Sequence, residues 1–148
     1  MPLHSEFPVV EGRYRLTRDW ELDLPAKFNR RIEDGNMVIW RPGLTFWIAI
    51  WGPQAAKTPE ETLAWILEDA SPDRFAERAE HSGDLIRLTY RLKEKDPDRD
   101  PTSYVAISGY VIGPSGHVQI SAYCDDAEAE SMGGNVIDSV HRTPEVAH

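Results

Sequence analysis

The sequence of 148 residues has a single cysteine, Cys124, and comparatively few basic residues. One thiol excludes a disulfide framework within the chain, and such cysteine usage is typical of a reducing compartment. Lysine and arginine number 16 against 25 acidic residues, a formal net charge of −9. Nucleic acid is therefore not expected as a partner, because binding to phosphates needs a basic face. The scattered acids favour a solvated surface, with an acidic patch for a basic partner as the alternative.

Long apolar runs are also missing from the chain. The longest, 46–51, is far shorter than the ~20 residues that a membrane-spanning helix needs. Residues 1–12 show no basic start followed by an apolar stretch, so we expect no secretory signal and a cytoplasmic protein without a membrane partner. A length of 148 residues fits one domain. We expect a flexible arm at 1–12, a single α+β domain at 13–142 and a C-terminal tail at 143–148.

Complete motifs for catalysis or metal binding are missing as well. Asp96, Asp98 and Asp100 have the spacing with which a calcium-binding loop begins. Pro101 stands where that loop requires glycine, and Ile107 where it requires a bidentate glutamate, which favours a solvated charged loop. The five histidines are dispersed, and there is no glycine-rich phosphate loop or serine nucleophile elbow. We therefore expect no metal and no cofactor.

An enzymatic function would have to rest on His117 or Cys124. Cys124 is next to Asp125 and near the start of a predicted helix, where the pKa of a thiol is lowered in some proteins. Cys124 also shares its strand phase with Ile120 and Ala122, which favours a small core residue. A hydrolase that uses His117 or Cys124 is thus the less favoured alternative.

The run 37–51, MVIWRPGLTFWIAIW, is apolar in both strand phases. Side chains alternate between the two faces of a strand, so Phe46 and Trp47 belong to opposite faces. We predict that both are largely buried, in the centre of a sheet that is covered on both sides. For Trp40, Trp47 and Trp51, cover by a helix is favoured over an exposed groove for a partner.

Two helices are expected. Thr58 is a hydroxyl cap that is followed by proline at the first helical position, and Glu61 completes a capping box. Apolar residues then recur at helical spacing. The second helix is expected from Asp126 to about Arg142, and its glycines at 133–134 indicate close packing against the sheet or a local break.

The remaining elements are expected to be strands. The first two are short, at 14–17 and 20–24, and Pro25 ends the second because proline lacks a ladder donor. The period of 74–81 is ambiguous, and a strand is favoured there because a turn follows at 83–84. The later strands are expected at 85–93, 103–112 and 117–124.

The last hairpin carries the most distinctive predicted surface. With a four-residue loop at 113–116, the register places Tyr110 opposite Gln119. One face is then rich in hydroxyl groups and aromatic rings, which suits recognition of a protein partner. Its residues are Tyr104, Ser108, Tyr110, His117, Gln119, Ser121 and Tyr123. An ordinary solvated sheet surface, partly roofed by a helix, is the competing interpretation.

Several short segments together resemble a known family. They are the strand end LDLP, the helix start TPEE, the strands ISGYVI and VQISAY, and the closing NVIDSV. In this order, over residues 14–142, they resemble the PsbP-like superfamily, which includes the yeast Ran-release factor and small bacterial proteins of unknown function. The resemblance implies an α/β/α sandwich and binding to a protein partner without catalysis. One bacterial branch consists of cytoplasmic chaperones for type VI secretion effectors.

We therefore predict an α+β fold in which a mostly antiparallel twisted sheet is covered by helices. The predicted function is that of a non-enzymatic bacterial binding or chaperone-like accessory protein, with secretion as one setting. A small-ligand-binding domain is the alternative. The sequence leaves the oligomeric state open, a homodimer included.

Overall fold

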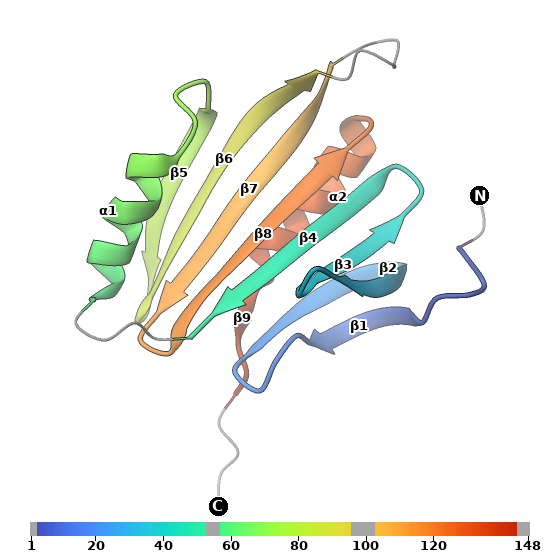
Figure 1. The fold of residues 1–148 in the computed structure, drawn as a ribbon, viewed down its shortest axis with the longest axis horizontal. Helices are drawn as coiled ribbons and strands as arrows, with labels where there is room; N and C mark the ends of the chain where they lie inside the picture. The colour runs from blue at the N-terminus through green and yellow to red at the C-terminus, as the bar shows by residue number, and fades with distance from the viewer. Residues whose placement is uncertain (1–2, 53–56, 96–102, 145–148) are drawn as a thin grey trace, which may run out of the picture.

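The computed structural model describes residues 3–52, 57–95 and 103–144 (Figure 1). The strands are β1 (Val9–Arg15), β2 (Trp20–Glu33), β3 (Asn36–Arg41), β4 (Leu44–Trp51), β5 (Phe75–Ser82), β6 (Leu85–Lys95), β7 (Ser103–Gly113), β8 (Gly116–Cys124) and β9 (His141–Arg142), and the helices are α1 (Pro59–Asp69) and α2 (Ala127–Asp138). These strands form one nine-stranded sheet in the order β1-β2-β3-β4-β8-β7-β6-β5, with β9 paired to β2. All of its strand pairs are antiparallel.

The two helices lie on opposite faces of this sheet (Figure 1). Val111 and Ile112 are neighbours on β7, so their side chains point to opposite faces. Val111 belongs to the large core cluster that includes Val136 of α2, whereas Ile112 belongs to a smaller cluster around Ile66 of α1. The sheet is therefore buried on both faces at β7, but by two separate cores.

The expected α/β/α sandwich with helices covering the sheet is wrong, because the protein is mostly an antiparallel β-sheet. α1 packs chiefly on β6 and β7, while α2 packs on β8 and its neighbours across the other face. A helix is about 10 Å wide and strands are ~4.8 Å apart, so one helix covers about two strands. Two short helices therefore leave much of the sheet without helical cover.

The central hairpin is only partly as predicted. Phe46 is fully buried in the large core, and Trp47, on the opposite face, is half-buried. Cover of the tryptophans by a helix is wrong, since α1 packs over β6 and β7 rather than β4, and Trp51 is 41% exposed. Both strand phases are apolar because one faces the core under α2 and the other forms a largely aromatic surface.

The segment before β1 covers the tryptophan of β3. The ring of Phe7 meets the ring of Trp40 edge to face, with centroids 5.0 Å apart. The buried Asn29 side chain donates to the backbone oxygens of His4 and Phe7, at 2.9 and 3.2 Å. Strand pairing begins at Val9, inside the segment that was expected to be an arm.

Strand β2 continues through Pro25, where the sequence pattern predicted its end. The pairing with β1 shifts register between Val10 and Gly12, opposite this part of β2. The pairing with β3 begins only at Asn29, and that with β9 involves Trp20 and its neighbour. Proline is tolerated at such an irregularity because no ladder partner needs its missing N–H group.

The predicted start of α1 is confirmed. The Thr58 hydroxyl accepts a hydrogen bond from the backbone N–H of Glu61, and the Glu61 carboxylate accepts one from the N–H of Thr58, both at 3.2 Å. The strand favoured at 74–81 is likewise confirmed as β5, which lies at an edge of the sheet. The capping box and the turn after β5 are both set by neighbouring residues, so these two predictions depend little on the rest of the fold.

Asp126, where the second helix was expected to begin, is the N-cap of α2, but the helix ends at Asp138 rather than near Arg142. The hydroxyl of Ser139 accepts a hydrogen bond from the backbone N–H of Asp23 on β2, at 2.9 Å. This contact holds the end of α2 beside β2, and the chain then pairs with β2 as β9. In β9, Nε2 of His141 lies 2.8 Å from the buried carboxylate of Glu21.

Close packing of α2 on the sheet depends on glycines of both elements. A Cβ atom at Gly133 would lie 3.2 Å from Cβ of Ala122, so the expectation of close packing is confirmed there. On the sheet side, a Cβ atom at Gly109 would lie 2.5 Å from Cγ2 of Ile137. At Gly134 the nearest atoms are 4.0 Å away, which leaves room for a methyl group.

We therefore expect opposite effects from the same substitution at two glycines. Gly109→Ala should destabilise the protein by about 1–3 kcal/mol, because the new methyl group overpacks the contact with the stiff Ile137 side chain. Gly134→Ala should stabilise it by up to about 1 kcal/mol through higher helix propensity. Urea denaturation of both variants measures these changes. Wild-type stability of Gly109→Ala would contradict this placement of α2.

Candidate functional site

The predicted register of the β7–β8 hairpin is confirmed. Tyr110 lies opposite Gln119, as the alternation of residue types predicted. The turn is tighter than expected, because Gly113 pairs with Gly116 and only residues 114–115 connect the strands. A shorter turn with the same centre leaves every cross-strand pair unchanged, so the predicted face exists as one surface.

The seven predicted residues divide into three groups. Three of them line a common cavity: Tyr110, His117 and Gln119. Three more share the face without lining the cavity: Ser108, Ser121 and Tyr123. The remaining residue, Tyr104, lies on β7, and its side chain falls outside the part of the chain that the structure describes. The cavity therefore lies at one end of the predicted face, next to the turn of the hairpin.

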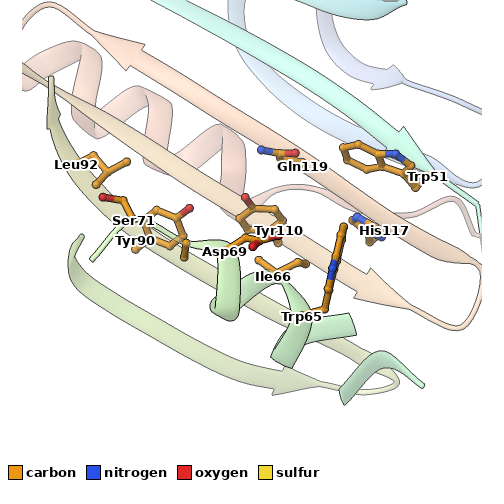
Figure 2. Close-up of a pocket in the computed structure, with 11 residues that line it drawn as sticks. Trp51, Trp65, Ile66, Asp69, Ser71, Tyr90, Leu92, Tyr110, His117 and Gln119 are labelled. Atoms are coloured by element: carbon orange, nitrogen blue, oxygen red, sulfur yellow. The ribbon is translucent and has the colours of Figure 1, made fainter. Parts of the chain in front are cut away.

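This cavity of about 260 Å³ lies between α1 and the sheet (Figure 2). The β4–β8 register brings Trp51 opposite His117, and β6 adds Tyr90 and Leu92 beside β7. The other lining residues come from α1 and the two positions after it: Trp65, Ile66, Asp69, Ala70 and Ser71. The cavity thus forms where the C-terminal half of α1 meets four strands.

His117 is the most unusual group in the lining. Its side chain belongs to a residue that is only 5% exposed, and its ring stacks on the ring of Trp51 with centroids 4.8 Å apart. Burial lowers the pKa of His117 from its ordinary value, so the imidazole is neutral at pH 7. No hydrogen bond to this ring comes from the described residues. A neutral imidazole therefore offers one donor and one acceptor to an occupant of the cavity.

Two tyrosines form the floor of the cavity. The rings of Tyr90 and Tyr110 are roughly parallel, with centroids 6.3 Å apart. Burial, and secondly a hydrogen bond with Tyr90, raise the pKa of Tyr110 well above its usual range. Both features keep its hydroxyl protonated, so the floor presents polar groups without charge.

Trp65 and Asp69 were missed by sequence reasoning. Trp65 is 46% exposed although it is large and apolar, because it lies outside the stripe that buries Ile66. It lines the same cavity as Trp51 and His117, as Figure 2 shows. A large aromatic residue on the polar side of an amphipathic helix is a signal that marks such a position. No pattern in the sequence indicated that this helix would lie over β6 and β7.

Cys124 has no part in this cavity. Its pairing with Leu44 and Val105 turns it to the α2 face, where it belongs to the large core. Burial, with smaller effects of neighbouring charges led by Glu130, raises the pKa of Cys124 to about 12. The core interpretation is confirmed, and a catalytic pair with His117 is excluded because the two residues lie on opposite faces of β8.

Metal chemistry finds no support in the described part of the chain. No group of three or more histidine, cysteine, aspartate or glutamate residues is placed there to hold a metal ion. The aspartates at positions 96, 98 and 100 lie outside the described residues. Among the described helices, none is long and apolar enough to cross a membrane.

Comparison with known proteins adds no family. No family model matches the chain, and no curated protein matches its sequence. A function is therefore inferred from the cavity and its surroundings.

The neutral state of His117 predicts a pH dependence of stability. The pKa of this residue is lower in the folded protein than its ordinary value of 6.5, so the unfolded chain binds more protons below that pH. Its contribution to stability should be complete above pH 6.5 and be lost as the pH falls through the lower folded pKa. In urea denaturation, the free energy of unfolding of the His117→Gln variant should decrease less steeply below pH 6.5 than that of the wild type. His81→Gln, at an exposed histidine, is the matched control, and equal slopes for His117→Gln and the wild type would contradict the burial argument.

The thiol of Cys124 should be inert in the folded protein. Alkylation of Cys124 by iodoacetamide at pH 7 should be slower in the folded than in the unfolded protein by a factor on the order of 10³. Raising the pKa from 9.0 to about 12 lowers the thiolate fraction by that factor. Mass spectrometry of native and unfolded protein measures the two rates. A second thiol from Ser82→Cys, on the exposed edge strand, should react rapidly in the same sample. Rapid native alkylation of Cys124 would contradict its placement.

Proposed function

We propose that this is a non-enzymatic binding protein whose cavity between α1 and the sheet receives a side chain of a protein partner. The carrying observation is the His117 ring, which is buried in the lining and has hydrogen-bonding capacity that the described residues do not use. The fully buried side-chain atoms that lack a partner in the described chain are Ser115 Oγ and Thr143 Oγ1, so the His117 nitrogens are open to the cavity. An inserted polar group of a partner would satisfy this ring.

The size of the cavity supports a single side chain as the occupant. Its volume of about 260 Å³ lies below the ≈ 300–1,000 Å³ that is usual for small-molecule pockets. Interface hot spots are bulky residues that fill such desolvated pockets in the partner. A binding site for one anchor residue therefore fits better than a binding site for a complete small molecule.

The rim of the cavity supports a protein surface as the partner. Trp51 and Trp65 are 41% and 46% exposed, and both line the cavity together with His117 (Figure 2). Exposed tryptophans supply contact area together with a hydrogen-bond donor, and they are enriched in protein interfaces. A chaperone-like role, in which the protein holds a segment of its client, would use the same groove.

Hydrolysis is less well supported by the geometry. A histidine base is normally oriented by a hydrogen bond from its second nitrogen to a third group. His117 has no such bond within the described chain, and its ring is held by the Trp51 ring instead. The thiol that the sequence offered as a nucleophile lies on the far face of the sheet.

A matched pair of tryptophan substitutions tests the proposal. Gln119→Trp should fill the cavity, whereas Ser121→Trp places the same side chain two residues further along β8, outside the lining. Peptides selected on the wild-type protein from a displayed random library should bind Gln119→Trp about tenfold more weakly or worse, since a filled pocket excludes the anchor residue. Their affinity for Ser121→Trp should stay near the wild-type value.

Thermal denaturation of both variants controls for folding. The proposal fails if the selected peptides bind both folded variants as well as they bind the wild type. It also fails if the wild-type protein enriches no peptide at all.

A further inference from the structure

The end of α1 concentrates negative charge at the cavity. The helix ends at Asp69, its last turn also contains Glu68, and it has no basic residue in that turn. Helix C-termini carry partial negative charge and usually gain stability from lysine or arginine there. Asp69 lines the cavity together with the two residues that follow it. The acidic helix end thus faces the space in which an occupant would lie.

Cations of the chain itself approach this region without lining the cavity. The Arg74 guanidinium donates to the backbone oxygen of Ser71 at 2.9 Å and also pairs with Glu77. The Lys57 ammonium lies over the Trp65 ring, 4.9 Å from its centroid. Among the residues that the structure describes, neither cation lines the cavity, and His117 is the only basic residue that does. The ring of Trp65 therefore already interacts with one cation. The carboxylate of Asp69, in contrast, has no lysine or arginine beside it among the described lining residues.

The lining also suits a flat occupant that donates several hydrogen bonds. Figure 2 shows the rings of Trp65 and Tyr110 on different sides of the space above Ile66. Acceptors are available at the carboxylate of Asp69, the amide oxygen of Gln119 and the free ring nitrogen of His117. A guanidinium group is planar, stacks on aromatic faces, carries five N–H donors and is more weakly hydrated than an ammonium group.

We propose that the cavity binds the guanidinium group of an arginine side chain on a protein partner, with Asp69 as its carboxylate and with His117 and Gln119 as acceptors. This assignment rests on the proposed function and adds the chemistry of the anchor residue. The net charge of −9 favours encounter with a basic segment over an acidic one.

Titration with blocked tripeptides tests the assignment. N-acetyl-Gly-Arg-Gly-amide should shift the indole N–H signals of Trp51 and Trp65 in two-dimensional NMR spectra of the full chain. The citrulline analogue, which has the same shape without the charge, should bind about tenfold more weakly, and the norleucine analogue should bind more weakly still.

Two aspartate variants locate the charge. Asp69→Asn should abolish the preference for arginine over citrulline. Asp73→Asn changes an exposed aspartate that does not line the cavity, and it should keep the preference.

The outcomes separate this inference from the proposed function. Equal or tighter binding of the citrulline or norleucine peptide overturns the guanidinium assignment and leaves the cavity as a binding site. A preference that survives Asp69→Asn overturns the role of that carboxylate. If no tripeptide shifts the two indole signals, the guanidinium assignment fails, and the library selection with Gln119→Trp decides separately whether the cavity binds a partner.

Discussion

The pairing of β4 with β8 is the interaction on which the rest of the structure depends. Strands β1 to β4 pair in chain order and so do β5 to β8, and this ladder joins the two groups into one sheet. It runs from Leu44 opposite Cys124 to Trp51 opposite His117 and therefore closes a long loop. Burial of apolar side chains along the ladder must offset the entropy cost of closing that loop. At Gly116, with φ +124°, a Cβ atom would lie 2.0 Å from the carbonyl oxygen of Trp51, so the approach of the two strands requires glycine.

The cavity follows from this ladder and from the narrow cover that α1 provides. One face of the joined sheet buries a continuous apolar core under α2. The other face has α1 over β6 and β7 and the segment before β1 over the far strands, with β8 and β4 between them. Polar residues such as Gln119 are tolerated there because they line the cavity and remain partly exposed. His117 is more strongly buried, and it avoids the cost of a buried charge by staying neutral.

Features set by neighbouring residues were predictable from the sequence. The capping box of Thr58 and Glu61 spans one helical turn, and its hydrogen bonds form whatever the helix packs against. The register of β7 with β8 follows from a short turn and from side-chain alternation, so Tyr110 was placed opposite Gln119 correctly although the turn proved shorter. Cys124 was recognised as a core residue because its phase matched that of its apolar neighbours.

The sequence by itself thus determined which strand phases and helix stripes are apolar, where α1 begins and which side chains of the last hairpin share a face. Only the tertiary structure decided what meets those surfaces, since periodicity identifies an apolar face but carries no information about its partner. For this reason the sheet was expected to be covered by helices, β2 was expected to stop at Pro25, and α2 was expected to continue through the residues that form β9. The convergence of Trp65 and Asp69 with His117 likewise requires α1 to lie over β6 and β7, a contact between distant segments that no local pattern specifies.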